Sequence, residues 1–228
     1  MIQDEAKHAT AVSAAKELFW ARGYDEASID DVVKATGLNR YAIYSAFGGK
    51  RDLFLATLQA YHEERRSVFL RHFDDPARPP LDAVRKVAEF CIAEMTERRT
   101  GCLVCNLAMD VGRDDPVVAE RVDAYLQEIN SAFTAALARA AERGELNDTV
   151  SPAEAAQVLV ALILGVGALA RAGASREALQ STFLAAVDGL CAKPGAAPAR
   201  PAAPPIEIND NDVCGRRARA EPRRDETE

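Results

Sequence analysis

Residues 28–54 hold two short helix patterns separated by a glycine turn, and this segment constrains the fold more than any other part of the chain. Ser28 is followed three positions later by an aspartate, a variant of the capping box that starts helices and places a carboxylate at the positive end of the helix dipole. Gly37 can take the left-handed backbone conformation that a tight turn requires. Asn39 can then cap a second helix over residues 40–47. The pattern predicts a helix-turn-helix.

Positive charge is concentrated beside this turn, in a chain whose net charge is -7. Between positions 38 and 51 the cations are Arg40, Lys50 and Arg51, and no acidic residue occurs there. A recognition helix reads base edges in the DNA major groove with side chains near its N-terminus, whereas lysines and helix N-termini hold phosphates. The candidates for base contact are Arg40, Tyr41, Ala42 and Ser45, and the candidates for phosphate contact are Ser28, Tyr44 and Lys50.

Three stretches of this segment match the pattern of a known family. They read L-F-x-x-x-G-Y over residues 18–24, SIDDVVKATGL over residues 28–38 and AIYSAFGGKRDLF over residues 42–54. Across about residues 5–55 the chain resembles the N-terminal DNA-binding domain of the TetR family of transcriptional regulators.

This resemblance implies roles for individual residues. Those matching Tyr44, Phe47 and Lys50 lie in and just after the recognition helix of the family. Tyr41 departs from the family pattern, which usually has a small residue there, so the base preference of relatives does not transfer to this chain.

The composition is typical of a folded cytoplasmic protein. The chain has 228 residues, 48% of them hydrophobic, and can therefore bury a core in one or two domains. It has no run of about 18 apolar residues, and its acidic N-terminus does not resemble a signal peptide. Five unevenly spaced cysteines do not suggest a disulfide framework. We expect a cytoplasmic protein with reduced thiols and no membrane association.

Helical periodicity runs through nearly the whole chain, which predicts an all-α fold. After a first helix that Gly23 ends, and beyond the helix-turn-helix, the expected helices span residues 51–72, 81–98, 102–111, 115–142, 152–172 and 175–191. Six of the eleven prolines lie from position 194 onward, which favours disorder there. The predicted division is a DNA-binding domain (1–50), a ligand-sensing and dimerisation domain (51–192) and a disordered tail (193–228).

The last two expected helices carry more apolar surface than one chain needs. Their apolar residues are Val158, Leu159, Leu162, Ile163, Val166 and Leu169 in the first, and Phe183, Leu184, Val187 and Leu190 in the second. A four-helix interface between two subunits explains this excess better than burial within one chain. The TetR resemblance also implies pairing through these helices, so we expect a homodimer.

Residues 98–106, RRTGCLVCN, are the other chemically distinctive stretch. If a helix begins at Gly101 or Cys102, the Cys102 sulfur lies at the positive end of the helix dipole beside two arginines, and both features favour the thiolate. Cys105, one turn later, and Cys91, on the preceding helix, could form a disulfide with an oxidised Cys102. Simple packing is the alternative, because cysteines are among the most buried residues.

The segment G-C-L-x-x-N that opens this helix is similar to segments of TetR relatives that sense electrophiles, oxidants or small unsaturated acids. In that group the cysteine matching Cys102 is reactive or adjacent to the ligand. We expect a pocket among the helices between residues 51 and 142, where Tyr61, Asn106 and Tyr125 either orient a small molecule or simply pack. No metal or cofactor is expected, because none of the three histidines lies at ligand spacing beside the cysteine pair.

The leading interpretation is a dimeric repressor that a small-molecule effector or a cysteine modification releases from a palindromic operator. An alternative is a helical thiol oxidoreductase using Cys102 and Cys105, although the histidine that follows the pair in enzymes of that kind is absent. A third is a helical interaction module that does not bind DNA. The sequence contains no catalytic triad, Walker loop or dinucleotide fingerprint, so we do not expect an enzyme.

Overall fold

The protein is all-α in a computed structural model that describes residues 2–75, 77–110, 115–191, 204 and 206. The helices are α1 (Ile2–Arg22), α2 (Ile29–Thr36), α3 (Arg40–Phe47), α4 (Lys50–Phe73), α5 (Pro80–Arg98), α6 (Leu103–Asp110), α7 (Pro116–Glu142), α8 (Pro152–Arg171) and α9 (Arg176–Gly189). Within the described ranges, the β pairing is one isolated bridge between Leu146 and Cys191. The predicted fold class is confirmed.

Local capping interactions define both helices of the helix-turn-helix. The Ser28 N–H donates to the Asp31 carboxylate at 3.0 Å, and the Asp31 N–H donates to Ser28 Oγ at 3.1 Å, which completes the capping box of α2. Gly37 ends α2 with a φ of 70°. The Asn39 side chain then accepts the Ala42 N–H at 2.8 Å and caps α3. These interactions follow from the sequence pattern and fix where α2 and α3 begin and where α2 ends.

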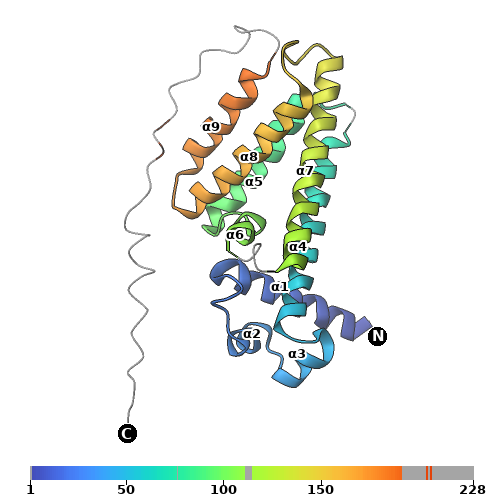
Figure 1. Cartoon of the computed structure of the whole chain (residues 1–228), viewed down its shortest axis with the longest axis vertical. Coiled ribbons are helices and arrows are strands. Elements are labelled where there is room, and N and C mark those ends of the chain that lie inside the picture. The colour runs from blue at the N-terminus through green and yellow to red at the C-terminus, as the bar shows by residue number, and fades with distance from the viewer. Residues whose placement is uncertain (1, 76, 111–114, 192–203, 205, 207–228) are drawn as a thin grey trace.

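α1 holds the helix-turn-helix against the beginning of α4. Phe19 of α1 meets Phe54 of α4 edge-on, with 5.2 Å between ring centroids. Val32 of α2 and Ile43 of α3 are fully buried and belong to the same hydrophobic cluster as these two rings. The helix-turn-helix lies at one end of the molecule, and α4 runs from it into the body (Figure 1). α4 therefore connects the helix-turn-helix directly to the body of the molecule.

The body of the molecule is built from α4, α5, α7, α8 and α9, and the short α6 packs against α7 and α8 (Figure 1). α7 supplies its central apolar stripe, in which Val122, Tyr125, Ile129 and Phe133 repeat at spacings of three and four and are all buried.

The division of the chain at residues 50 and 192 stays a prediction. The tail from residue 193 lies outside the described residues, apart from positions 204 and 206.

α8 is long and apolar enough to pass a length-and-hydropathy test for a membrane span. The buried core helix of a soluble protein passes the same test, so the result is weak evidence. Leu159, Ile163 and Val166 of α8 are buried within the chain. Val158 is 59% exposed on the outer side of the same helix.

The outer side of α8 presents an apolar stripe. Leu162 and Leu169 are half-buried and continue the line that begins at Val158. In α9, by contrast, Phe183 and Val187 are fully buried within one chain and belong to its core. The excess apolar surface expected from the sequence is thus located mainly on the outer face of α8.

Candidate functional site

The N-terminal half of α3 is open to solvent. Tyr41 is 81% exposed and Tyr44 is 58% exposed, and Ser45 is exposed beside them. Ala42 is half-buried. Ser28 is exposed, but its hydroxyl donates to the Asp31 carboxylate at 2.6 Å in the capping box. Large exposed aromatic side chains are typical of contact surfaces, so α3 presents a face suited to a macromolecule.

The cations near α3 each have a partner that the sequence did not indicate. Arg40 binds Asp30 of α2 through two guanidinium nitrogens, the shorter contact being 2.8 Å. Arg51 likewise binds both oxygens of Asp115, at 2.9 and 3.0 Å. The third cation lies over an aromatic ring.

That third cation is Lys50, whose ammonium lies 4.3 Å from the centroid of the Tyr24 ring. Burial lowers the pKa of Lys50. A tyrosine beside a cation in this way orients the ammonium and shields part of it from water. That the seven residues named in the sequence analysis contact DNA stays a prediction.

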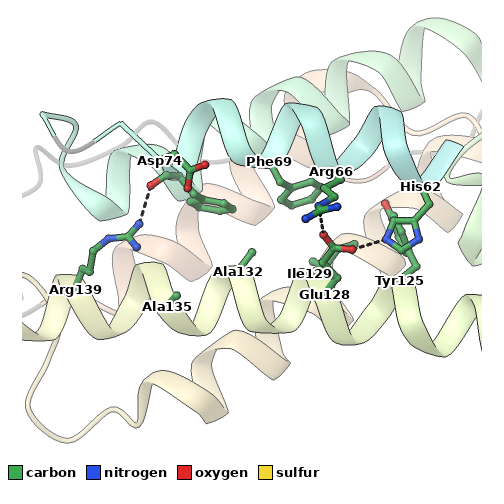
Figure 2. Close-up of a pocket in the computed structure, with 11 residues that line it drawn as sticks. His62, Arg66, Phe69, Asp74, Tyr125, Glu128, Ile129, Ala132, Ala135 and Arg139 are labelled. Atoms are coloured by element: carbon green, nitrogen blue, oxygen red, sulfur yellow. Dashed lines mark hydrogen bonds and ion pairs between the residues drawn. The ribbon is translucent and has the colours of Figure 1, made fainter. Parts of the chain in front are cut away.

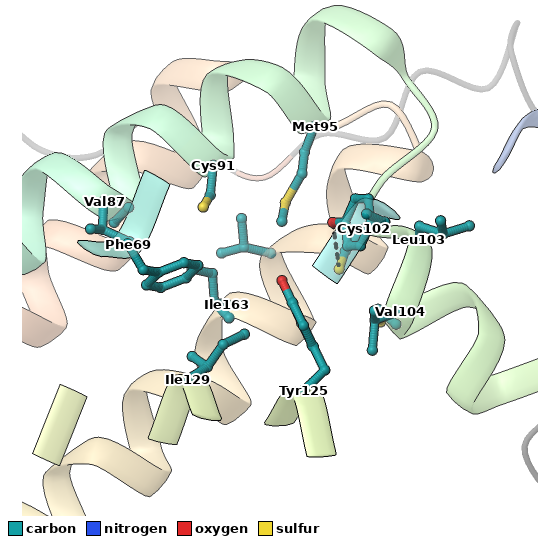
Figure 3. Packing of buried hydrophobic residues seen from close by; sticks show 14 of the residues in the cluster. Phe69, Val87, Cys91, Met95, Cys102, Leu103, Val104, Tyr125, Ile129 and Ile163 are labelled. Carbon is teal, nitrogen blue, oxygen red and sulfur yellow. Dashed lines mark hydrogen bonds between the residues drawn. The ribbon is translucent and has the colours of Figure 1, made fainter. Parts of the chain in front are cut away.

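Cys102 occupies the position just before α6, in a closed chamber at the centre of the molecule. Its side chain is 3% exposed, and its Sγ lies 3.6 Å from the Tyr61 hydroxyl. Cys91 and Met95 of α5 and Tyr125 of α7 point toward the same space (Figure 3). The cavity among them is about 20 Å³, room for about one water molecule. The structure therefore brings together four of the six predicted sensing residues: Cys91, Cys102, Tyr61 and Tyr125.

The loop that carries Cys102 is fastened to the DNA-binding end of the molecule. The indole Nε1 of Trp20, in α1, donates to the Gly101 carbonyl at 3.0 Å in a buried hydrogen bond. Asn106 donates to the Thr100 carbonyl at 2.8 Å. Asn106 thus holds the loop and does not line the chamber. The sequence analysis missed Trp20, the single tryptophan of the chain.

The two sulfurs of the C-x-x-C pair have different neighbours. Cys105 Sγ lies 3.5 Å from the Leu164 carbonyl of α8, whereas Cys102 Sγ faces Tyr61. All four cysteines within the described ranges are free thiols. Arg98, expected beside Cys102, instead binds Glu17 and lies over the Trp20 ring, 5.1 Å from its centroid. A carboxylate of α1 thus holds the Arg98 guanidinium, and a role of Arg98 in stabilising a Cys102 thiolate stays a prediction.

Burial raises the pKa of Cys91 to about 12 and that of Cys105 to about 11. Because the thiolate is the reactive form, alkylation at Cys105 should accelerate about tenfold per pH unit between about pH 7 and 10, and Cys91 should react more slowly still. Peptide mass spectrometry after timed iodoacetamide treatment measures both rates. In urea, where the thiols are exposed, both rates should level off above about pH 9. A plateau near pH 9 in the native protein would contradict the assigned burial.

A buried ion pair completes the wall of the chamber. Arg65 of α4 is 6% exposed and binds Glu94 of α5, with Nη2 2.7 Å from Oε1. Burial is the largest single influence and would lower the pKa of Arg65, but the hydrogen bonds to Glu94 and the Coulombic effects of neighbouring groups together outweigh it and raise that pKa. No sequence signal pointed to this pair. Among the described residues, no group of three or more His, Cys, Asp or Glu side chains could hold a metal ion.

The capped α2 and α3, with the exposed face of α3, define a helix-turn-helix DNA-binding protein. Residues 11–57 match the family described as "Bacterial regulatory proteins, tetR family". Residues 80–186 match the "Tetracyclin repressor-like, C-terminal domain". The chain belongs to the TetR family of DNA-binding transcriptional regulators.

Individual relatives support the assignment. The chain is 28% identical over 141 residues to the uncharacterised HTH-type transcriptional regulator YezE of Bacillus subtilis, covering 61% of this chain and 72% of YezE. It is 27% identical over 179 residues to the HTH-type transcriptional repressor ComR of Escherichia coli, and the match covers 74% of this chain and 81% of ComR. A cysteine-substituted variant of the TetR family regulator CifR, solved with 26-bp double-stranded operator DNA, superposes with a TM-score of 0.70 at 25% identity, covering 80% of this chain and 95% of that one.

Proposed function

We propose that this protein is a homodimeric, cytoplasmic repressor that binds a palindromic operator and leaves it when Cys102 is modified or an effector enters the Cys102 chamber. The α3 face would read bases through Arg40, Tyr41, Ala42 and Ser45, while Ser28, Tyr44 and Lys50 hold phosphates. The apolar stripe of α8 that begins at Val158 would form the subunit interface.

One observation carries the sensing part of the proposal: Cys102 is joined to the DNA-binding end from two sides. Through Gly101 its loop accepts the Trp20 hydrogen bond from α1, at 3.0 Å. Through its sulfur it contacts Tyr61 of α4, the helix that follows α3. The rings of Trp20 and Tyr61 in turn meet edge-on at 5.3 Å. A displacement at Cys102 therefore acts on both helices that support α3.

The chamber is too small to take an adduct without movement. A cavity of about 20 Å³ holds about one water molecule, whereas an adduct adds several heavy atoms to Cys102. Close-packed interiors respond to added volume by shifting side chains and backbone. Modification would thus displace Tyr61 or the Gly101 loop, and the two recognition helices of a dimer would no longer match major grooves about 34–36 Å apart.

The reaction that we propose for an electrophile is addition to an activated carbon–carbon double bond. The Cys102 sulfur forms a bond to one alkene carbon, the double bond becomes single, and the thiol proton ends on the neighbouring carbon. No electrons are lost or gained from outside, so no oxidant is needed.

Selection of bound duplexes from a random DNA pool tests this function. The reduced protein and Cys102→Ser should recover the same palindromic site. Iodoacetamide should weaken the affinity of the unsubstituted protein for that site by at least about tenfold, within the range usual for allosteric coupling. Cys102→Ser should resist this effect, because it lacks the sulfur that reacts.

Cys191→Ser is the matched control, because Cys191 is a half-buried thiol after α9. This variant should remain as sensitive to iodoacetamide as the unsubstituted protein. Recovery of no common site would reject operator binding. Equal affinities before and after alkylation would reject control through Cys102.

The oxidoreductase alternative is less well supported. Both sulfurs of the C-x-x-C pair are buried, and burial raises the pKa of Cys105 to about 11, which disfavours the thiolate that such catalysis needs. The relatives described above are transcriptional regulators.

A further inference from the structure

A cleft between α4 and α7 lies outside the Cys102 chamber. Phe69 of α4 and Ile129 and Ala132 of α7 form its apolar floor (Figure 2). Phe73 of α4 also lines the cleft. The cavity is about 140 Å³, far larger than the chamber of about 20 Å³. The cleft is lined by residues of α4 and α7 and by Asp74, which follows α4.

The charged groups on the rim of the cleft bind one another. His62 and Arg66 of α4 both bind Glu128 of α7, with Arg66 Nε 3.0 Å from the carboxylate. Arg139 donates to the Phe73 carbonyl at 2.9 Å, and Asp74 lies beside it. Two arginines thus face two carboxylates, so the rim offers no excess charge to attract an ion of either sign.

We propose that this cleft is a binding site for a neutral molecule with a single aromatic ring and one hydrogen-bonding substituent. An apolar cavity of about 150 Å³ is large enough for benzene, which matches the volume between α4 and α7. The balanced rim favours a neutral ligand, and the His62–Glu128 pair at one end supplies polar atoms for the substituent.

The cleft and the Cys102 chamber share a wall. Phe69, Tyr125 and Ile129 line both cavities. The Tyr125 ring lies 5.9 Å from that of Tyr61, whose hydroxyl contacts the Cys102 sulfur. A ring held against Tyr125 therefore changes the packing around Cys102. This regulatory role rests on the proposed function, whereas the binding site itself does not.

Three probes of equal size and different charge test the site: benzyl alcohol, benzoate and benzylammonium. Calorimetry with the full chain should show benzyl alcohol binding with a dissociation constant on the order of 1 mM or below, at least about fivefold tighter than either ion. Methyl NMR should place the largest shifts at Ile129 and Ala132. Saturating benzyl alcohol should change the rate of iodoacetamide modification at Cys102 by at least about threefold.

A pair of alanine-to-leucine substitutions on α7, one inside the cleft and one outside it, gives a matched comparison of benzyl alcohol binding. Ala132→Leu extends a half-buried side chain into the cleft and should weaken benzyl alcohol binding at least about tenfold, and Ala135→Leu serves if Ala132→Leu does not fold. Ala138→Leu, a half-buried alanine of α7 outside the cleft lining, should bind as the unsubstituted protein does.

The proposal would be overturned if benzyl alcohol did not bind, or if benzoate or benzylammonium bound more tightly than benzyl alcohol. It would also be overturned if Ala132→Leu and Ala138→Leu lost benzyl alcohol affinity equally. An unchanged Cys102 rate at saturation would overturn the link to the chamber. Because none of these measurements involves DNA, their failure is distinguishable from failure of operator binding.

Discussion

Replacing Arg40 and Lys50 together with alanine should weaken binding to the selected operator by about 100-fold or more. A base contact from an arginine contributes about 1–3 kcal/mol, and a phosphate contact adds to it. The slope of log affinity against log salt should also become shallower by about one or two, because fewer phosphates are neutralised. Both side chains lie at the surface or are half-buried, so the melting temperature should change little. Titration of labelled duplex at several salt concentrations measures affinity and slope together.

The double variant Lys86→Ala with Arg121→Ala is the charge-matched control. It removes two positive charges from exposed positions on α5 and α7, outside the helix-turn-helix. It should keep the affinity within about threefold, because exposed charges beyond a Debye length are largely screened. Equal losses in the two double variants would mean that general charge, and not the α3 face, drives binding.

Gly101→Ala should lower the free energy of unfolding by about 2–5 kcal/mol. Gly101 has a φ of 67°, which costs an L residue about 1–2 kcal/mol. A Cβ there would also lie 2.5 Å from the Gly167 carbonyl oxygen, and relieving such a clash in a packed core costs about 1–3 kcal/mol more. Urea unfolding followed by circular dichroism measures the loss.

Gly144→Ala separates these two causes. Gly144 has nearly the same φ, 66°, but a Cβ at this position would meet nothing within 4 Å. Its substitution should cost only the backbone contribution of about 1–2 kcal/mol. If Gly101→Ala proved no more destabilising than Gly144→Ala, the close approach of the cysteine loop to α8 would be refuted.

The sequence predicted the elements whose signals are local. Ser28 and Asn39 cap α2 and α3 through atoms within three residues, so the helix-turn-helix could be predicted from spacing alone. The period of three and four in α7 is likewise a local pattern in the sequence, and its residues Val122, Tyr125, Ile129 and Phe133 are buried. The C-x-x-C pattern of residues 102–105 drew attention to Cys102, and the family resemblance then favoured a sensing role over simple packing.

Pairings between distant residues could not be predicted in this way. Trp20 and Gly101 are 81 positions apart, and their hydrogen bond exists because α1 packs next to the loop before α6. For the same reason the sequence did not show that Asp115 holds Arg51, or that Glu17 binds Arg98. The ion-pair partner of a charged residue depends on tertiary packing. It therefore cannot be predicted from the charges of its neighbours in the sequence.

α8 touches the cysteine loop on one side and presents an apolar stripe on the other. A Cβ at Gly167 would lie 3.1 Å from the Cys102 Cβ, whereas Val158 is 59% exposed. One helix, about 10 Å across, therefore separates each thiol from the outer stripe. If two subunits join along that stripe, two helix diameters, about 20 Å, lie between their Cys102 thiols. A dimer in which Cys102 is modified in one subunit only would then be a third form of the protein. Its affinity for DNA would differ from that of any mixture of fully unmodified and fully modified dimers.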